Sequence, residues 1–184
     1  MKLATLTGTK RGETDRLLQS VVARLKHDKV RLLGAVRAPD PGSSDAHCES
    51  TLSLLPDGPR VRITQDLGAG SSACRMDAGA LEEAVGVATV RLASDGADLV
   101  ILNKFGLSEA EGRGFRGLIA DALAQDIPVL VGLSDTHRAA FETFADGMAT
   151  QVAPDDTAIL EWCRVALGRP DLAQGAQQDV SLRA

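Results

Sequence analysis

Aromatic residues are scarce in this sequence, and tyrosine is absent altogether. Of the 184 residues, 44% are hydrophobic but only 3% are aromatic, so the core has to be built mainly from Ala, Val and Leu. A chain of this length is expected to form one domain with a sizeable core. We therefore assign residues 1–170 to a single α/β domain and residues 171–184 to a polar C-terminal tail.

Long hydrophobic runs and an excess of positive charge are also missing. No stretch reaches the roughly 18 apolar residues that a transmembrane helix needs, and the first residues lack the apolar region of a signal peptide. The formal net charge is −5, which argues against a general nucleic-acid-binding protein. We therefore expect a cytoplasmic protein that interacts with neither membranes nor nucleic acids.

Cysteine is limited to Cys48, Cys74 and Cys163, which are widely spaced and form no CxxC motif. An odd number of cysteines with this spacing fits reduced thiols in the cytoplasm better than a disulfide framework. His47 lies next to Cys48, but no second His/Cys pair has the spacing of a metal site. A buried thiol or one at a hairpin edge is the preferred interpretation.

The clearest pattern in the sequence is a predicted βαβ unit. Continuous apolar runs at 99–102 and 129–132 indicate strands buried on both faces. A helix is expected between them, with Ser108 as its N-cap and Glu111 completing a capping box. Its buried stripe would consist of Phe115, Leu118, Ile119 and Leu123.

Ligands in such folds bind at the carboxyl ends of the strands. Asn103 and Lys104, expected in the turn after the first strand of this unit, are therefore candidate binding residues. Further strands are predicted at 2–7, 30–36 and 147–152. Further helices are predicted after the first strand, ending at about residue 28, and at 77–94, 136–144 and 157–167. Two alternating runs on either side of a Pro-Asp-Gly-Pro turn predict a β-hairpin at about 47–66.

The turn after the first strand resembles a phosphate-binding loop in its position but not in its residues. A P-loop has the pattern GxxxxGK followed by Ser or Thr, and its lysine reaches the terminal phosphates. Here Glu13 stands where that lysine would be, and its carboxylate would repel a triphosphate. Lys10 and Arg11 leave positive charge beside a helix N-terminus, which suits a smaller anion. The alternative is an ordinary βα turn with a solvated basic pair.

A second unusual loop, at 66–77, contains glycines and serines followed by an arginine. Gly70 allows a tight backbone, Ser71 and Ser72 supply hydroxyl groups, and Arg75 supplies a planar cation. These are the components of an oxyanion nest. The alternative is a flexible loop whose serines cap the following helix.

The segments GTKRGETDRLL, ITQDLGAGSSACRMD and ILNKFGLSEAEGRG resemble a bacterial family of unknown function related to P-loop nucleoside-triphosphatases. The resemblance implies an α/β fold with a mostly parallel sheet and flanking helices, a P-loop NTPase-like three-layer sandwich with an inserted β-hairpin. Members of the family are often encoded beside molybdate-transport genes. The resemblance therefore implies a role in molybdenum or tungsten handling.

The sequence departs from catalytic P-loop enzymes at a second point. In those enzymes an acidic pair at a strand end holds magnesium and positions water, whereas this chain has Asn103 and Lys104. We therefore expect binding or storage of molybdate or tungstate without nucleotide hydrolysis, with no required cofactor, no catalytic residue and no direct ligand of a metal cation. The expected anion-binding residues are Gly8, Thr9, Lys10, Arg11, Gly12, Thr14, Gly70, Ser71, Ser72, Arg75, Asn103 and Lys104.

Two alternatives remain open from the sequence. The first is a nucleotide-binding NTPase or kinase-like enzyme with a non-standard phosphate loop, in which Lys104 or Arg75 replaces the missing lysine. The second is a regulatory or assembly protein that binds no small ligand. The Ala- and Leu-rich helix faces are compatible with a homo-oligomer as well as with a monomer.

Overall fold

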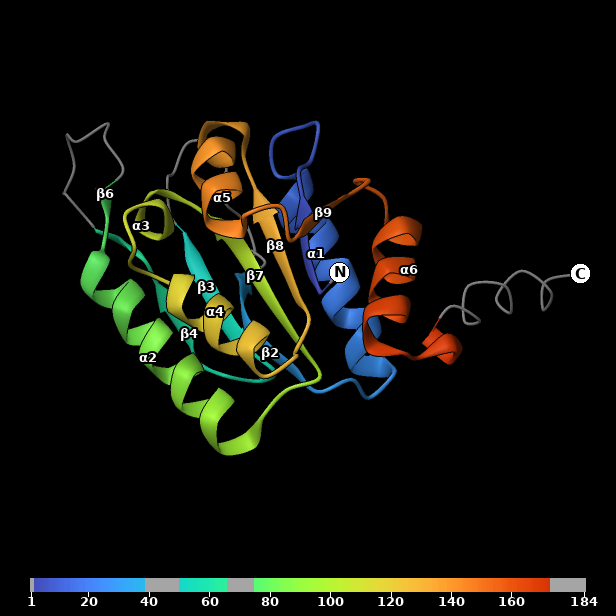
Figure 1. Cartoon of the computed structure of the whole chain (residues 1–184). Helices are drawn as coiled ribbons and strands as arrows, with labels where there is room; N and C mark the ends of the chain where they lie inside the picture. Colours follow the sequence, from blue (N-terminus) through green and yellow to red (C-terminus); the bar gives the residue numbers. More distant parts are fainter. Residues whose placement is uncertain (1, 39–49, 66–74, 173–184) are drawn as a thin grey trace, which may run out of the picture.

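The computed structural model describes residues 2–38, 50–65 and 75–172, and a seven-stranded sheet runs through them (Figure 1). The strand order is β4-β3-β2-β7-β8-β1-β9. Strands β2, β7, β8, β1 and β9 are parallel, while β3 is antiparallel to β2 and β4 to β3. The strands are β1 (Leu3–Leu6), β2 (Leu32–Arg37), β3 (Thr51–Leu55), β4 (Arg60–Arg62), β7 (Leu99–Phe105), β8 (Val129–Leu133) and β9 (Ala149–Val152). The predicted mostly parallel sheet is confirmed.

Helices cover both faces of the sheet. Figure 1 shows α2 (Ala78–Asp95), α4 (Arg116–Ala124) and α5 (Arg138–Ala145) on one side, and α1 (Glu13–His27) and α6 (Asp156–Leu167) on the other. Each side has its own hydrophobic cluster, because strands buried on both faces direct alternate side chains to opposite layers. The predicted three-layer arrangement is confirmed.

Two of the helices predicted from the sequence are present as α1 and α2. The apolar residues of α1 recur at helical spacing and are buried against the sheet: Leu17, Leu18, Val21, Val22 and Leu25. Asp77 is the N-cap of α2, and its side chain accepts a hydrogen bond from the Ala80 amide at 3.0 Å. Such a cap contributes about 1 kcal/mol to helix stability.

The predicted hairpin is present, and within the described residues its strands are β3 and β4. Strands β3 and β4 pair antiparallel, with Thr51 opposite Arg62. The chain then makes a small ladder that the sequence did not predict, in which β5 (Thr64–Gln65) pairs with β6 (Arg75–Met76). His47, Cys48 and Cys74 lie outside the described residues.

The predicted start of the helix after β7 was wrong. The structure has a short helix, α3 (Leu107–Ala110), and α4 begins only at Arg116. Gly112 and Gly114 adopt left-handed conformations, with φ of 85° and 57°, and separate the two helices. The capping role falls to Glu109 rather than Ser108: its carboxylate accepts the Gly106 amide at 2.9 Å.

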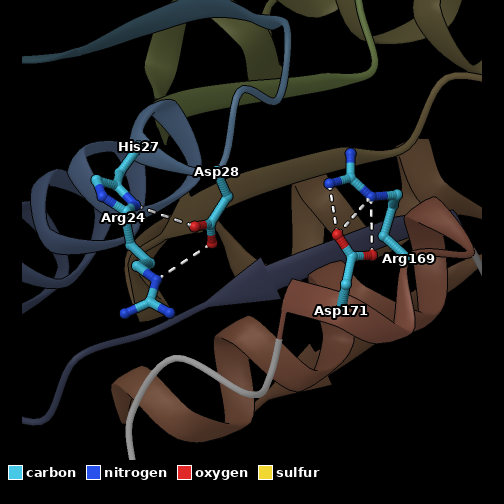
Figure 2. Close-up of polar contacts among 5 residues, drawn as sticks. All are labelled: Arg24, His27, Asp28, Arg169 and Asp171. Atoms are coloured by element: carbon cyan, nitrogen blue, oxygen red, sulfur yellow. Dashed lines mark hydrogen bonds and ion pairs between the residues drawn. The ribbon is translucent and has the colours of Figure 1, made fainter. Parts of the chain in front are cut away.

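The segment after α6 folds back toward the C-terminal end of α1. Figure 2 shows the polar contacts there: Arg24 bonds Asp28 at 3.1 Å, and Arg169 pairs with Asp171 at 2.7 Å. Leu172 is buried in the cluster shared by α1 and α6. Cys163 belongs to the same cluster, and burial raises the pKa of its thiol to about 12. This thiol therefore stays protonated at neutral pH.

Within the described residues, no helix combines the length and the apolar character that crossing a bilayer requires.

Candidate anion-binding site

A cavity of about 370 Å³ lies at the carboxyl ends of β1, β7 and β8. Parallel strands end at the same edge of a sheet, and this is where ligands of doubly wound folds bind. The cavity brings together eight residues that the sequence singled out, from two separate segments: Gly8, Thr9, Lys10, Arg11, Gly12, Thr14, Asn103 and Lys104. The predicted residues of these two segments therefore line one cavity.

The structure adds residues that sequence reasoning missed. Asp15 lines the cavity from the first turn of α1, and Ser134 and Asp135 line it from the segment after β8. The position of the last two directly after a buried strand was the signal that could have identified them.

The remaining predicted residues come from the loop at 66–77. Gly70, Ser71 and Ser72 lie outside the described residues. Arg75 begins β6, where it is paired with Gln65. Their part in binding therefore stays a prediction.

The loop between β1 and α1 closes on the first turn of the helix. The Gly8 amide donates to the Thr14 hydroxyl at 2.9 Å. A Cβ atom at Gly8 would lie 2.8 Å from the Thr14 amide nitrogen, and Gly12 has a φ of 75°. Both positions therefore favour glycine, because a side chain would clash at the first and strain the backbone at the second.

Glu13 occupies the centre of this loop with its own carboxylate. One oxygen, Oε2, accepts the Thr9 amide at 2.6 Å, the Thr9 hydroxyl at 2.9 Å and the Lys10 amide at 3.2 Å. The hydrogen bond from the Thr9 hydroxyl, followed by those from the two amides, lowers the pKa of Glu13 below its usual range. The loop thus holds an anionic oxygen in the way that a phosphate loop holds its ligand, but the chain supplies that oxygen itself.

Asn103 is oriented by the neighbouring strand. Its Oδ1 atom accepts the Arg37 amide at 3.0 Å. Because a backbone N–H requires an oxygen partner, this bond fixes the amide orientation and leaves the NH₂ group as the donor for other contacts. Such a donor suits an anion, whereas magnesium prefers oxygen ligands.

Lys104 lies in a β-bulge rather than in the predicted turn. Leu102 pairs with Val131 and Phe105 with Leu133, so β7 has one residue more than β8 between these two pairs. Bulges redirect side chains and occur often beside functional sites. Gly132 permits the close approach of the strands here, because a Cβ atom on it would lie 2.0 Å from the Asn103 carbonyl oxygen.

Some charged side chains around the cavity have a partner of opposite charge, and others do not. Asp15 pairs with Arg37 at 3.4 Å, and Asp135 pairs with Arg138 at 2.7 Å. The exposed side chains of Arg11 and Lys104 have no hydrogen-bond or ion-pair partner in the part of the chain that the structure describes. Among these same residues, no group of three His, Cys, Asp or Glu side chains could hold a metal ion. Two cations on the cavity wall are thus left unpaired among the described residues.

The strand order, with the loop after β1 facing the ends of β7 and β8, defines a P-loop NTPase-like α/β fold. The crystal structure of THEP1 from the hyperthermophile Aquifex aeolicus is similar in fold, with a TM-score of 0.56 and 15% sequence identity. The similarity covers 82% of this chain and 88% of that one. The chain belongs to the family described as "Protein of unknown function (DUF2478)", whose model matches residues 3–162.

The chain is also similar in sequence to a protein of known name. The chain is 30% identical over 163 residues to "Molybdenum import ATP-binding protein ModC 2" of Bradyrhizobium diazoefficiens. This match covers 89% of the present chain but 18% of the relative. The predicted link to a family of unknown function with a P-loop NTPase-like fold is thereby confirmed.

Proposed function

We propose that the protein binds or stores a tetrahedral oxyanion, molybdate or tungstate, at the carboxyl ends of β1, β7 and β8, without hydrolysing nucleotides. The observation that carries this proposal is the loop at 8–14, whose amides already hold the carboxylate oxygen of Glu13. On the opposite wall of the cavity, the amide of Asn103 and the ammonium group of Lys104 stand where catalytic P-loop enzymes have their magnesium-binding acids. The name of the relative from Bradyrhizobium diazoefficiens supports molybdenum as the element concerned.

The donors around the cavity match the chemistry of such an ion. Molybdate and tungstate are doubly charged and accept several hydrogen bonds. Lys104 offers three ammonium donors, Arg11 a guanidinium group and Asn103 an amide NH₂. Because the Thr9 and Lys10 amides are taken by Glu13, we expect an incoming anion to displace this carboxylate and to use the same two donors.

Removing the ammonium group of Lys104 is expected to weaken oxyanion binding. A charge-assisted hydrogen bond contributes about 1.5–3 kcal/mol, which corresponds to a ten- to hundredfold change in affinity. Lys104→Ala should therefore raise the dissociation constant for molybdate and tungstate by about this factor. Arg75→Ala should raise the dissociation constant in the same way, because the sequence predicts that the Arg75 guanidinium also binds the anion. Isothermal titration calorimetry measures both, and circular dichroism checks that the variants are folded.

The matched control for this experiment is Lys29→Asn. Lys29 is an exposed cation at the far end of α1 with a φ of 57°, which asparagine tolerates better than alanine does. Lys29→Asn should leave the affinity for molybdate and tungstate unchanged. Glu13→Ala should act in the opposite direction and tighten binding severalfold, because it frees the Thr9 and Lys10 amides. Equal affinities for the parent, Lys104→Ala and Glu13→Ala would show that this cavity is not the site.

Hydrolysis of ATP or GTP is expected to be absent. Glu13 replaces the lysine that would stabilise the transferred phosphoryl group, and Asn103 and Lys104 replace the magnesium-binding acids. Phosphate release should therefore stay at background with and without magnesium. A magnesium-dependent turnover on the order of 1 per second would favour the alternative, an NTPase or kinase-like enzyme.

A thermal-shift panel separates the three functions. Stronger stabilisation by molybdate and tungstate than by sulfate or phosphate supports the proposal. Stabilisation by ATP or GTP with magnesium supports a nucleotide-binding enzyme, for which the P-loop-like fold is the specific observation. No shift with any of these ligands supports a regulatory or assembly protein. A ligand present at a hundred times its dissociation constant adds about 2.7 kcal/mol of stability, which such a panel detects.

A further inference from the structure

A second cavity, of about 200 Å³, adjoins the anion-binding site and differs from it in chemistry. The two cavities share Asp15, Asn103 and Lys104, which lie on the boundary between them. The second one extends from this boundary toward the hairpin β3–β4, the start of α2 and the helix α3. A single ligand could therefore contact both.

The walls of the second cavity are largely apolar. Leu52 and Ile63 contribute from the hairpin side, Leu81 from α2, and Phe115 from the start of α4. Leu107 lines it from α3 and is itself 57% exposed, which is unusual for a leucine of this fold. A concave apolar surface of this kind is typical of sites that take the organic part of a small molecule.

Most polar groups of this cavity already have partners. Asp15 pairs with Arg37, and the Glu109 carboxylate accepts the Gly106 amide at 2.9 Å and the Phe115 amide at 3.0 Å. The Ser108 hydroxyl is different. Ser108 is only 5% exposed and lines the cavity, yet its side chain has no hydrogen-bond partner among the described residues. The hydroxyl oxygen itself keeps access to solvent in the cavity, so it can bond a ligand or water there.

We propose that the second cavity holds the aromatic ring of an organic phosphate monoester, whose phosphoryl group lies beside Lys104 and Asn103 in the first cavity. This inference rests on the proposed function, because it requires the strand ends to bind a tetrahedral oxyanion. Three observations support it. The apolar walls suit a ring, the cationic boundary suits its phosphoryl group, and the Ser108 hydroxyl can bond a polar atom on the ring edge.

The experiment compares inorganic phosphate, methyl phosphate, phenyl phosphate and tungstate, each titrated directly into the protein by isothermal titration calorimetry. Burying one face of a ring of about 100 Å² corresponds to a ten- to hundredfold gain in affinity. Phenyl phosphate should therefore bind at least about tenfold more tightly than inorganic phosphate, and methyl phosphate should gain little. The methyl ester controls for the change in phosphate charge that esterification brings.

A pair of matched variants locates the ring. Leu107→Gln removes an exposed apolar side chain from the second cavity without adding charge, and Val165→Gln does the same on α6, where Val165 is 65% exposed. Leu107→Gln should reduce the advantage of phenyl phosphate about threefold or more while leaving the affinity for tungstate unchanged. Val165→Gln should change neither affinity.

The outcomes distinguish this inference from the proposed function. If tungstate binds but phenyl phosphate binds no better than inorganic phosphate, the ring site is refuted and the oxyanion site stands. If phenyl phosphate binds in a manner sensitive to Leu107→Gln while molybdate and tungstate do not bind, the choice of inorganic ligand is refuted and the ring site stands. An advantage of phenyl phosphate that Leu107→Gln does not alter would place the ring elsewhere and overturn the inference.

Discussion

Phe105→Ala is expected to lower the free energy of unfolding by about 3–5 kcal/mol, the usual cost of truncating a buried phenylalanine. Phe105 is fully buried at the end of β7, directly after Lys104. Its ring lies 5.2 Å from that of Phe141 in an edge-to-face arrangement and 5.7 Å from that of Phe144. Such pairs add about 0.5–1.5 kcal/mol to the burial of apolar area.

The scarcity of aromatic residues makes this position more important. The chain has four phenylalanines, and all of them, Phe105, Phe115, Phe141 and Phe144, contribute to the hydrophobic cluster under α2, α4 and α5. The guanidinium of Arg116 also lies 4.6 Å from the centre of the Phe144 ring. The aromatic cluster therefore fixes the end of β7 that carries the candidate site.

Urea unfolding followed by circular dichroism measures the effect of Phe105→Ala. Val90→Ala, at an exposed position of α2, is the control and should change the stability by less than about 0.5 kcal/mol. A loss of less than about 1 kcal/mol for Phe105→Ala would mean that the end of β7 does not depend on this cluster.

Glu109→Ala is expected to destabilise the protein by about 2–5 kcal/mol, because it leaves two backbone amides without acceptors. Glu109 is 4% exposed, and its two carboxylate oxygens accept the Gly106 amide at 2.9 Å and the Phe115 amide at 3.0 Å. These bonds join α3 to the start of α4 across the two left-handed glycines. Without them, the segment between β7 and α4 loses two of its hydrogen bonds.

The controls separate this network from simple loss of charge. Glu111→Ala removes an exposed acid two residues away whose partner is Arg113, and it should cost less than about 1 kcal/mol. Glu109→Gln keeps one oxygen acceptor and should be intermediate. Urea unfolding of the three variants tests the order, and equal stabilities of Glu109→Ala and Glu111→Ala would contradict it.

The sequence by itself determined the fold class and the edge at which to look. Apolar runs such as 99–102 predict strands buried on both faces, and the spacing of Leu17, Val21 and Leu25 predicts the buried side of α1. The helix predicted at 77–94 is likewise present, as α2. These features depend on residues that are close together in the chain, and local periodicity and capping therefore suffice to predict them.

Only the tertiary structure decided how the candidate site is built. The bulge at Asn103 and Lys104 depends on the register between β7 and β8 and on the missing side chain of Gly132. The orientation of Asn103 depends on the amide of Arg37, which is 66 residues away in the chain.

The sequence did not predict the hydrogen-bonding roles of Glu13 and Ser108, and the physical reason is the same for both. The sequence marks Glu13 as a residue that repels phosphate, but only the folded loop turns its carboxylate onto the Thr9 and Lys10 amides. Ser108 has the side chain of a helix cap, yet the amides of Ala110 and Glu111 that it would bind donate to the carbonyls of Gly106 and Leu107. Which donor meets which acceptor is set by the competition among all groups that folding brings together, and most of those groups are distant in the sequence.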